Sequence, residues 1–207
     1  EQDTPRGLPD AFKIGKNFIG NDNVSLILGD NFFYGQSLSE KLNKCSKLKK
    51  GATIFIHPVR NPSQFGIVTL KSKKIINLVE KPKKTKSNLA VTGLYFFDNT
   101  VIKKTLELKK SKRNELEIID LLKIYHKKNL LKAEILGRGA AWLDAGTIED
   151  FNQTSIFVSS VERRQGFKIA CLEEIALLNK WIDKKKIKKA ISFYGNCEYS
   201  KYLKSLI

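Results

Sequence analysis

The feature that most limits the possible folds is an apolar run, a helical stretch and a second apolar run in succession. Residues 23–28 (NVSLIL) have the composition of a buried strand and lead directly into Gly29 and Asp30. Residues 38–48 predict a helix, and residues 52–59 (ATIFIHPV) predict a second buried strand. Because this strand–helix–strand order favours a parallel sheet, we expect an α/β fold of Rossmann type.

The rest of the chain predicts further elements and two parts. Short strands at 66–70 and 75–79 flank the polar turn KSKK, followed by a long strand at 89–97, helices at 100–108 and 116–127, strands at 132–136 and 140–144, and a helix at 148–161. Beyond Gly166 the pattern is helical and basic. We therefore predict a core over residues 1–164, with a hairpin region at 60–98, and a helical C-terminal subdomain over residues 165–207.

A formal net charge of +17 is typical of proteins that bind nucleic acid or an anionic membrane surface. The lysines, however, are spread over turns and helix faces, and the run KKKIKK at 184–189 reads as one solvated helix face. We expect neither partner. No apolar run reaches the roughly 20 residues that a bilayer requires, and no signal peptide is evident, which predicts a cytoplasmic protein. The three cysteines form no zinc motif and are expected to be reduced thiols.

Two acids follow predicted strands and are the first candidates for chemistry. Asp30 ends VSLILG, and Asp144 ends AAWL; each lies close to a glycine. In an open α/β sheet, ligands bind beyond the carboxyl ends of the strands. Two carboxylates meeting there would suit Mg²⁺, which prefers oxygen ligands. Taken singly, each acid is better explained as a helix cap or a side-chain turn.

The sequence resembles the glucose-1-phosphate thymidylyltransferase family of bacterial sugar activation. The resemblance runs from Gln2 to near the C-terminus and rests on seven segments: LGDNFFYG at 28–35, FGIV at 65–68, EKP at 80–82, SNLAVTGLYFFD at 87–98, RNELEIID at 113–120, GRGAAWLDAGT at 137–147 and ERRQGFKIACLEEIA at 162–176. It implies a nucleotidyltransferase that condenses glucose 1-phosphate with dTTP to give dTDP-glucose and pyrophosphate, for dTDP-rhamnose, other deoxysugars and cell-surface polysaccharide.

The resemblance also implies roles for particular residues. Asp30 and Asp144 would hold Mg²⁺ between the phosphates, and Lys81 and Arg113 would complete the catalytic set. No general base is needed, because the attacking phosphate oxygen is already anionic. The expected substrate contacts are Gln2 and Gly7 at the pyrimidine base, Gly66, Glu80, Val91 and Gly93 at the glucose ring, and Lys81, Tyr95 and Arg113 at its phosphate. Without the resemblance, Glu80 and Lys81 would be a surface pair before Pro82, and Tyr95 a core aromatic.

Several features depart from the family pattern. Members begin with a glycine-rich GGxGTRL loop followed by a lysine, and nothing in the chain matches it. We therefore expect an N-terminally truncated chain that is inactive alone. Asn114 replaces a usual glycine, Ile119 a usual threonine, and Ala145 a usual threonine that would have supplied a hydrogen bond beside Asp144.

Two other functions stay open, together with the state of assembly. A sister enzyme could make UDP-, CDP- or ADP-glucose on a similar scaffold, and a truncated remnant could act only as a binding module. The family resemblance also implies a homo-oligomer, a tetramer, with Phe32, Phe33, Tyr34 and the Glu174–Ile175 region matching its regulatory and interface segments.

Overall fold

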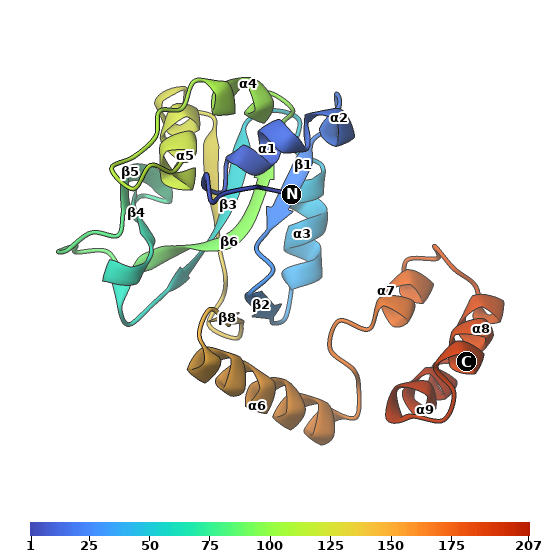
Figure 1. The fold of residues 1–207 in the computed structure, drawn as a ribbon. Coiled ribbons are helices and arrows are strands. Elements are labelled where there is room, and N and C mark those ends of the chain that lie inside the picture. Colours follow the sequence, from blue (N-terminus) through green and yellow to red (C-terminus); the bar gives the residue numbers. More distant parts are fainter. The chain divides into compact units, whose positions relative to one another are not determined.

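The computed structural model describes residues Glu1–Ile207, and these form two compact units, Glu1–Gly146 and Thr147–Ile207. The elements of the first unit, shown in Figure 1, are α1 (Asp10–Ile14), α2 (Lys16–Ile19), β1 (Val24–Ile27), β2 (Asn31–Tyr34), α3 (Leu38–Ser46), β3 (Ala52–Pro58), the 3₁₀ turn η1 (Pro62–Gln64), β4 (Gly66–Lys71), β5 (Lys74–Glu80), β6 (Leu89–Phe97), α4 (Val101–Leu106), α5 (Ile118–Lys127), β7 (Leu131–Ile135) and β8 (Ala141–Asp144).

Strand β6 is the centre of a six-stranded mixed sheet. Along one edge it pairs with β3, and along the other it pairs with β1 at its C-terminal half and with β4 at its N-terminal end, always antiparallel. The hairpin β4–β5 extends the sheet on one side, and β7 extends it on the other by pairing in parallel with β3. Strands β2 and β8 form a separate antiparallel ribbon.

The expectation of a parallel sheet is wrong: four of the five strand pairings in this sheet are antiparallel, and only β3 and β7 pair in parallel. Strands β1 and β3 do run in the same direction, because both are antiparallel to β6, but β6 lies between them. All but one residue of the run LAVTGLYFF are buried, which is typical of a strand covered on both faces. The strand–helix–strand prediction therefore gave the direction of the strands but missed their central neighbour.

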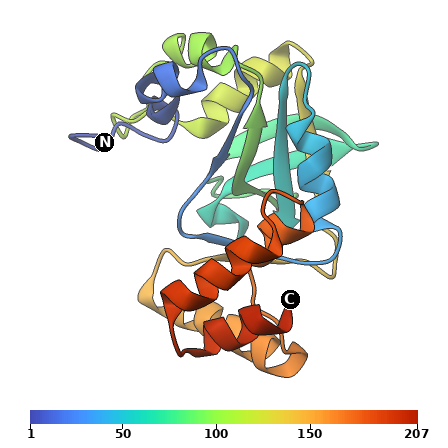
Figure 2. The same ribbon diagram turned by 90° about the vertical axis from the view of Figure 1, so that its right-hand side faces the viewer.

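Alternating residues of β3 and β6 feed two separate cores. Ile54 and Ile56 of β3 pack on one face of the sheet with helices α1, α4 and α5, whereas Phe55 packs on the other face with α3 and the β2–β8 ribbon. This follows from the period of two in a strand. Figure 2 shows α3 on the opposite side of the sheet from α1 and α4.

The second unit is helical, as expected, and consists of α6 (Ile148–Gln165), α7 (Leu172–Leu178), α8 (Lys184–Tyr194) and α9 (Glu198–Ser205). The Thr147 side chain caps α6, and Gly166, with φ +73°, ends it. In KKKIKK, Ile187 is fully buried and the lysines are exposed, which confirms a solvated helix face. The units divide between Gly146 and Thr147, which groups α6 with the later helices; the division at 164/165 stays a prediction. None of the helices combines the length and apolar character needed to cross a bilayer.

Candidate functional site

A cavity of about 240 Å³ gathers most of the residues predicted to contact a sugar phosphate. Its lining includes Gly66, Glu80, Lys81, Val91, Tyr95 and Arg113, which come from β4, the end of β5, β6 and the loop before α5. Segments that are distant in sequence therefore meet at one place.

The backbone adopts a left-handed conformation at Lys81, directly after β5 ends. Strand β5 stops at Glu80, and Lys81 has φ +39°, in the left-handed region that residues with a side chain rarely adopt. The Lys81 backbone N–H donates to the Phe65 carbonyl over 3.1 Å. In a regular strand the two neighbouring side chains would face opposite ways. This backbone conformation allows both Glu80 and Lys81 to line the same cavity, as the family resemblance implied.

Charges in this cavity are arranged around Arg113. Its Nε and Nη2 donate to the two carboxylate oxygens of Glu117 over 3.2 and 2.7 Å, and Nη2 lies 3.8 Å from Glu80 Oε1. Burial raises the pKa of Glu80, and the nearby charge of Glu117 raises it further, against the opposing effect of Lys81 and Arg113. The cavity therefore carries charges of both signs, with two carboxylates beside a lysine and an arginine.

The walls of the cavity fit closely around the backbone of β4. A Cβ at Gly66 would lie 2.5 Å from Ile119 Cδ1 and 3.3 Å from Glu80 Oε2. Tyr95 lines the cavity yet is only 3% exposed, and burial, followed by the charge of Glu80, raises the pKa of its hydroxyl. The phenol therefore stays protonated, and Tyr95 serves the core as well as the cavity.

Gln2 and Gly7 lie in a second, neighbouring cavity of about 570 Å³. The two cavities share Leu8 and Glu115 in their linings. Gly7 has φ +93°, and a Cβ there would lie 2.1 Å from the Leu116 carbonyl oxygen, because Leu116 N–H donates to the Arg6 carbonyl beside it. Gly7 therefore also has a structural role that the sequence did not indicate.

Asp30 and Asp144 are brought together at the Gly146 backbone. The position that a Cβ would take at Gly146 lies 3.3 Å from Asp144 Oδ1 and 3.8 Å from Asp30 Oδ2. The Ala145 N–H donates to the Asp30 carbonyl over 2.7 Å, and Asn31 is the register partner of Asp144 in the β2–β8 ribbon. A glycine beside two converging carboxylate oxygens leaves space for a small cation with oxygen ligands, so these residues fit Mg²⁺.

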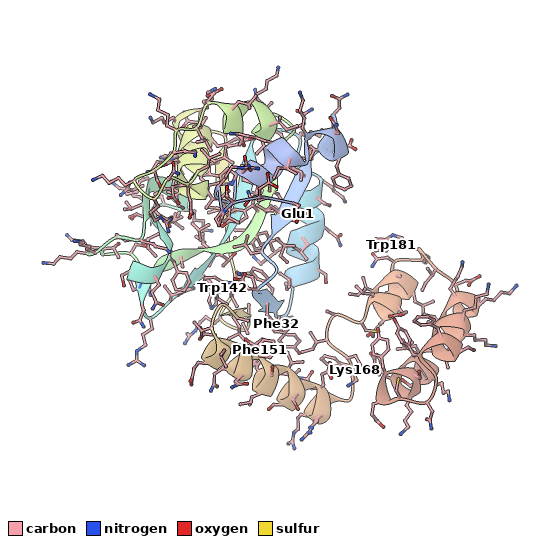
Figure 3. All side chains as sticks on the ribbon, in the orientation of Figure 1. Glu1, Phe32, Trp142, Phe151, Lys168 and Trp181 are labelled. Atoms are coloured by element: carbon pink, nitrogen blue, oxygen red, sulfur yellow. The ribbon has the colours of Figure 1, made fainter.

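Three residues around these sites were not identified from the sequence. Glu117 follows Arg113 at the helical spacing of four, which could have suggested an ion pair. Asn31 and Trp142 lie 111 positions apart, yet Trp142 Nε1 donates to Asn31 Oδ1 over 2.6 Å. No spacing rule could indicate that contact. In Figure 3, the labelled Trp142 of β8 lies near the labelled Phe32 of β2.

The structure also accounts for two further single residues. Asn114, where the family pattern has glycine, has φ +63°, a left-handed conformation that asparagine tolerates better than most residues. His57 belongs to β3, its ring lies 6.4 Å from that of Trp142, and burial lowers its pKa. It therefore stays neutral, in keeping with a structural role.

Comparison with known proteins gives consistent results. The sequence profile described as nucleotidyl transferase matches residues 1–160. A glucose-1-phosphate thymidylyltransferase of Neisseria meningitidis is 45% identical over 207 residues, which are the whole of this chain and 72% of that protein. A Mycobacterium tuberculosis protein of the same name is 43% identical over the same length, again 72% of that protein.

Among solved structures, a Bacillus anthracis protein assigned as a glucose-1-phosphate thymidylyltransferase, in complex with sucrose, matches with a TM-score of 0.68 and 35% identity. That match covers 75% of this chain and 62% of the other. A UDP-glucose pyrophosphorylase complexed with UDP-glucose matches with a TM-score of 0.67 and 25% identity, over 77% of this chain and 64% of the other.

Proposed function

This chain belongs to the nucleotidyl transferase family and, within it, to the glucose-1-phosphate thymidylyltransferases, and from that membership we propose that it condenses glucose 1-phosphate with dTTP to give dTDP-glucose and pyrophosphate. The observation that carries the proposal is the convergence of Gly66, Glu80, Lys81, Val91, Tyr95 and Arg113 on one cavity. Within one small volume, these residues provide a carboxylate that can accept hydrogen bonds from sugar hydroxyls and two cations that can bind a phosphate.

The sugar end of the substrate would be held by Glu80 and the sugar phosphate by Lys81 and Arg113. A charged Glu80 accepts hydrogen bonds from glucose hydroxyls, while a guanidinium can grip a phosphate through two parallel bonds. Backbone groups of Gly66 and Val91 would approach the ring. Because the phosphate of glucose 1-phosphate is already an anionic nucleophile, no general base is required. The half-buried His57, whose pKa is lowered by burial, is not needed in that chemistry.

We assign the metal site of this reaction to Asp30 and Asp144. The Gly146 backbone leaves room beside their facing oxygens, and carboxylate pairs are suited to Mg²⁺. When bound, the cation would neutralise charge on the phosphates during transfer. Asp30, which directly precedes β2, and Asp144, the last residue of β8, would hold the cation there.

The nucleotide preference is the part of the proposal with a specific rival. Gln2 can offer both a donor and an acceptor to a pyrimidine edge, and its Nε2 donates to the Gly7 carbonyl at 3.3 Å. Uracil presents the same edge as thymine, and the similarity to a UDP-glucose pyrophosphorylase supports UTP as the second candidate. The names of the curated relatives favour dTTP.

We also propose that the protein works as a homo-oligomer, a tetramer by resemblance, in the cytoplasm. Its second unit exposes large apolar side chains: Leu172 is 74% exposed, Trp181 73% and Phe193 84%. Apolar surface of this kind is typical of an interface. The product would supply dTDP-rhamnose and related sugars for cell-surface polysaccharide.

The test separates sugar binding from turnover. Calorimetry with the 207-residue chain should detect glucose 1-phosphate and little or no glucose 6-phosphate. Turnover is then measured as pyrophosphate release from dTTP, UTP, CTP and ATP, using the chain and a chimera that adds the family's glycine-rich loop. Selective release from dTTP with formation of dTDP-glucose supports the proposal. Selective release from UTP would favour the rival, and absence of sugar-phosphate binding would argue against the site.

A further inference from the structure

Asn31 uses both ends of its side-chain amide in the structure. Its Oδ1 accepts from Trp142 Nε1 over 2.6 Å and from the Gly93 backbone N–H over 3.1 Å. Its Nδ2 donates to Asp30 Oδ1 over 2.8 Å. The amide therefore touches the central strand β6, the ribbon strand β8 and the neighbouring aspartate.

The partners allow only one orientation of this amide. An indole N–H and a backbone N–H can only donate, so the end that they contact must be the carbonyl oxygen. The NH₂ group must then face Asp30, whose ionised carboxylate can only accept. Each partner thus supports the same assignment, and the amide cannot rotate by 180° without losing all three bonds.

This orientation has a consequence for Asp30. Its Oδ1 is engaged by Asn31, whereas its Oδ2 faces Gly146, where Asp144 Oδ1 also lies. Asn31 is also the register partner of Asp144, and Trp142, the donor to its Oδ1, lies two residues before Asp144 on β8. A single amide thereby links the strand of one carboxylate to the strand of the other.

Gly93 is part of the same arrangement. A Cβ there would lie 2.6 Å from Asn31 Oδ1 and 2.8 Å from Leu28 Cγ. The glycine therefore leaves the space that the Asn31 amide occupies. The need for a glycine at position 93 is therefore explained by packing against Asn31, without any contact to the sugar ring.

We propose that Asn31 is the positioning residue of the divalent-cation site: it fixes the carboxylate of Asp30 so that its free oxygen faces Asp144. This inference rests on the assignment of Asp30 and Asp144 to the metal under the proposed function. Hydrogen-bonding partners that orient metal ligands alter metal affinity by about 10- to 100-fold when they are removed. Asn31 would act in that way, without touching the cation itself.

The experiment measures Mn²⁺ binding to the 207-residue chain by electron paramagnetic resonance of the free ion, without nucleotide. Mn²⁺ serves as the probe because it shares the oxygen preference of Mg²⁺. The variants are Asn31→Leu, which removes all three bonds, and Trp142→Phe, which removes one donor and keeps the bond to Asp30. Asp30→Asn tests the ligand itself. Asn99→Leu is the matched control, since the Asn99 side chain donates to the Asn21 carbonyl away from the site.

We expect the Mn²⁺ dissociation constant to rise by about 10- to 100-fold in Asn31→Leu and by less in Trp142→Phe, with Asn99→Leu unchanged. Affinity for glucose 1-phosphate should not change in any of them, a result that general loss of structure would not give. If Asp30→Asn loses Mn²⁺ while Asn31→Leu binds like the wild type, the role of Asn31 is refuted and the metal assignment stands. If the wild type binds no better than Asp30→Asn, the metal assignment fails, and the role of Asn31 with it. Should Asn31→Leu not fold, unchanged affinity in Trp142→Phe refutes the proposal.

Discussion

Arg113 and Glu117 meet through two bonds, from Nη2 to Oε2 over 2.7 Å and from Nε to Oε1 over 3.2 Å. The guanidinium thus makes the same fork-shaped contact that it would make with a phosphate. Its side chain is half exposed, so the pair adds little to stability. Its more important effect is to hold the arginine in a defined orientation in the lining of the cavity.

Replacing Arg113 with lysine should weaken glucose 1-phosphate more than dTTP. A point charge would replace a fork, and a charge-assisted bond contributes about 1.5–3 kcal/mol, equivalent to roughly a 10- to 100-fold rise in KM for the sugar phosphate. The measurement is KM for each substrate in an active form of the protein. Arg60→Lys, at an exposed arginine, is the control. Equal losses for both substrates would assign Arg113 a structural role instead.

In a full-length form of the protein that carries the glycine-rich loop, Asp144→Asn should abolish turnover and leave the fold intact. Loss of one metal carboxylate removes transition-state stabilisation of several kcal/mol, so kcat should fall by about 1,000-fold or more at saturating Mg²⁺. Circular dichroism and thermal unfolding check the fold. Asp22→Asn, at an exposed aspartate, should keep its activity. A near-normal kcat in Asp144→Asn would remove this residue from the metal site.

Glu80→Gln should make the protein more stable at pH 7 while it weakens glucose 1-phosphate binding. The pKa of Glu80 is raised above its ordinary value of 4.5, mainly by burial. The folded state therefore favours the protonated form, and the stability associated with that form is present below pH 4.5 and lost as the pH rises through the raised pKa. The gain in Tm should be present at pH 7 and disappear below pH 4.5. Glu107→Gln, at an exposed glutamate, should show no such dependence; a gain that persists at low pH would contradict the assignment.

Gly7→Ala should destabilise the first unit. The added Cβ would lie 2.1 Å from the Leu116 carbonyl oxygen, in addition to the strain of φ +93°. Backbone strain alone costs about 1–3 kcal/mol. Gly20→Ala is a matched control, because Gly20 also has a positive φ, +54°, but open space around it. Urea unfolding should show a larger loss for Gly7→Ala than for Gly20→Ala, and equal losses would mean that the Leu116 backbone moves aside.

Phe193→Glu should reduce self-association of the chain. Phe193 is 84% exposed on α8, and a charge placed in an apolar interface is disfavoured. Sedimentation velocity should show the wild type above the monomer mass and the variant shifted towards it. Lys185→Glu changes an exposed lysine of the same helix and serves as the control. A wild type that sediments as a monomer at all concentrations would contradict the predicted oligomer.

Local sequence patterns predicted most helices and strands, whereas contacts between residues far apart in the chain could not be predicted from them. The hairpin at β4–β5 was predicted because a polar turn lies between two short apolar runs. In the structure, the turn residues Ser72 and Lys73 both have a positive φ. The insertion of β6 between β1 and β3 depends on partners more than 60 residues from β1, and no local pattern shows it.

The candidate site shows the same limit. Only the family resemblance led to the expectation that Glu80 and Lys81 share a cavity, and the structure achieves this through the positive φ of Lys81. Asn31 could not be identified, because its partners Gly93 and Trp142 come from two other strands. Side-chain networks of this kind become visible only when the strands are placed.

The bond between Trp142 and Asn31 also makes the protein optically informative. The chain has only two tryptophans, Trp142 and Trp181, and the second is 73% exposed in the helical unit. Replacing Trp181 with phenylalanine would leave a single indole as the source of tryptophan emission. That indole donates to the residue that holds Asp30, and its ring lies 5.2 Å from that of Phe65, beside the sugar-phosphate cavity. A change in wavelength or intensity would then report events at the carboxylate pair in real time, without a label.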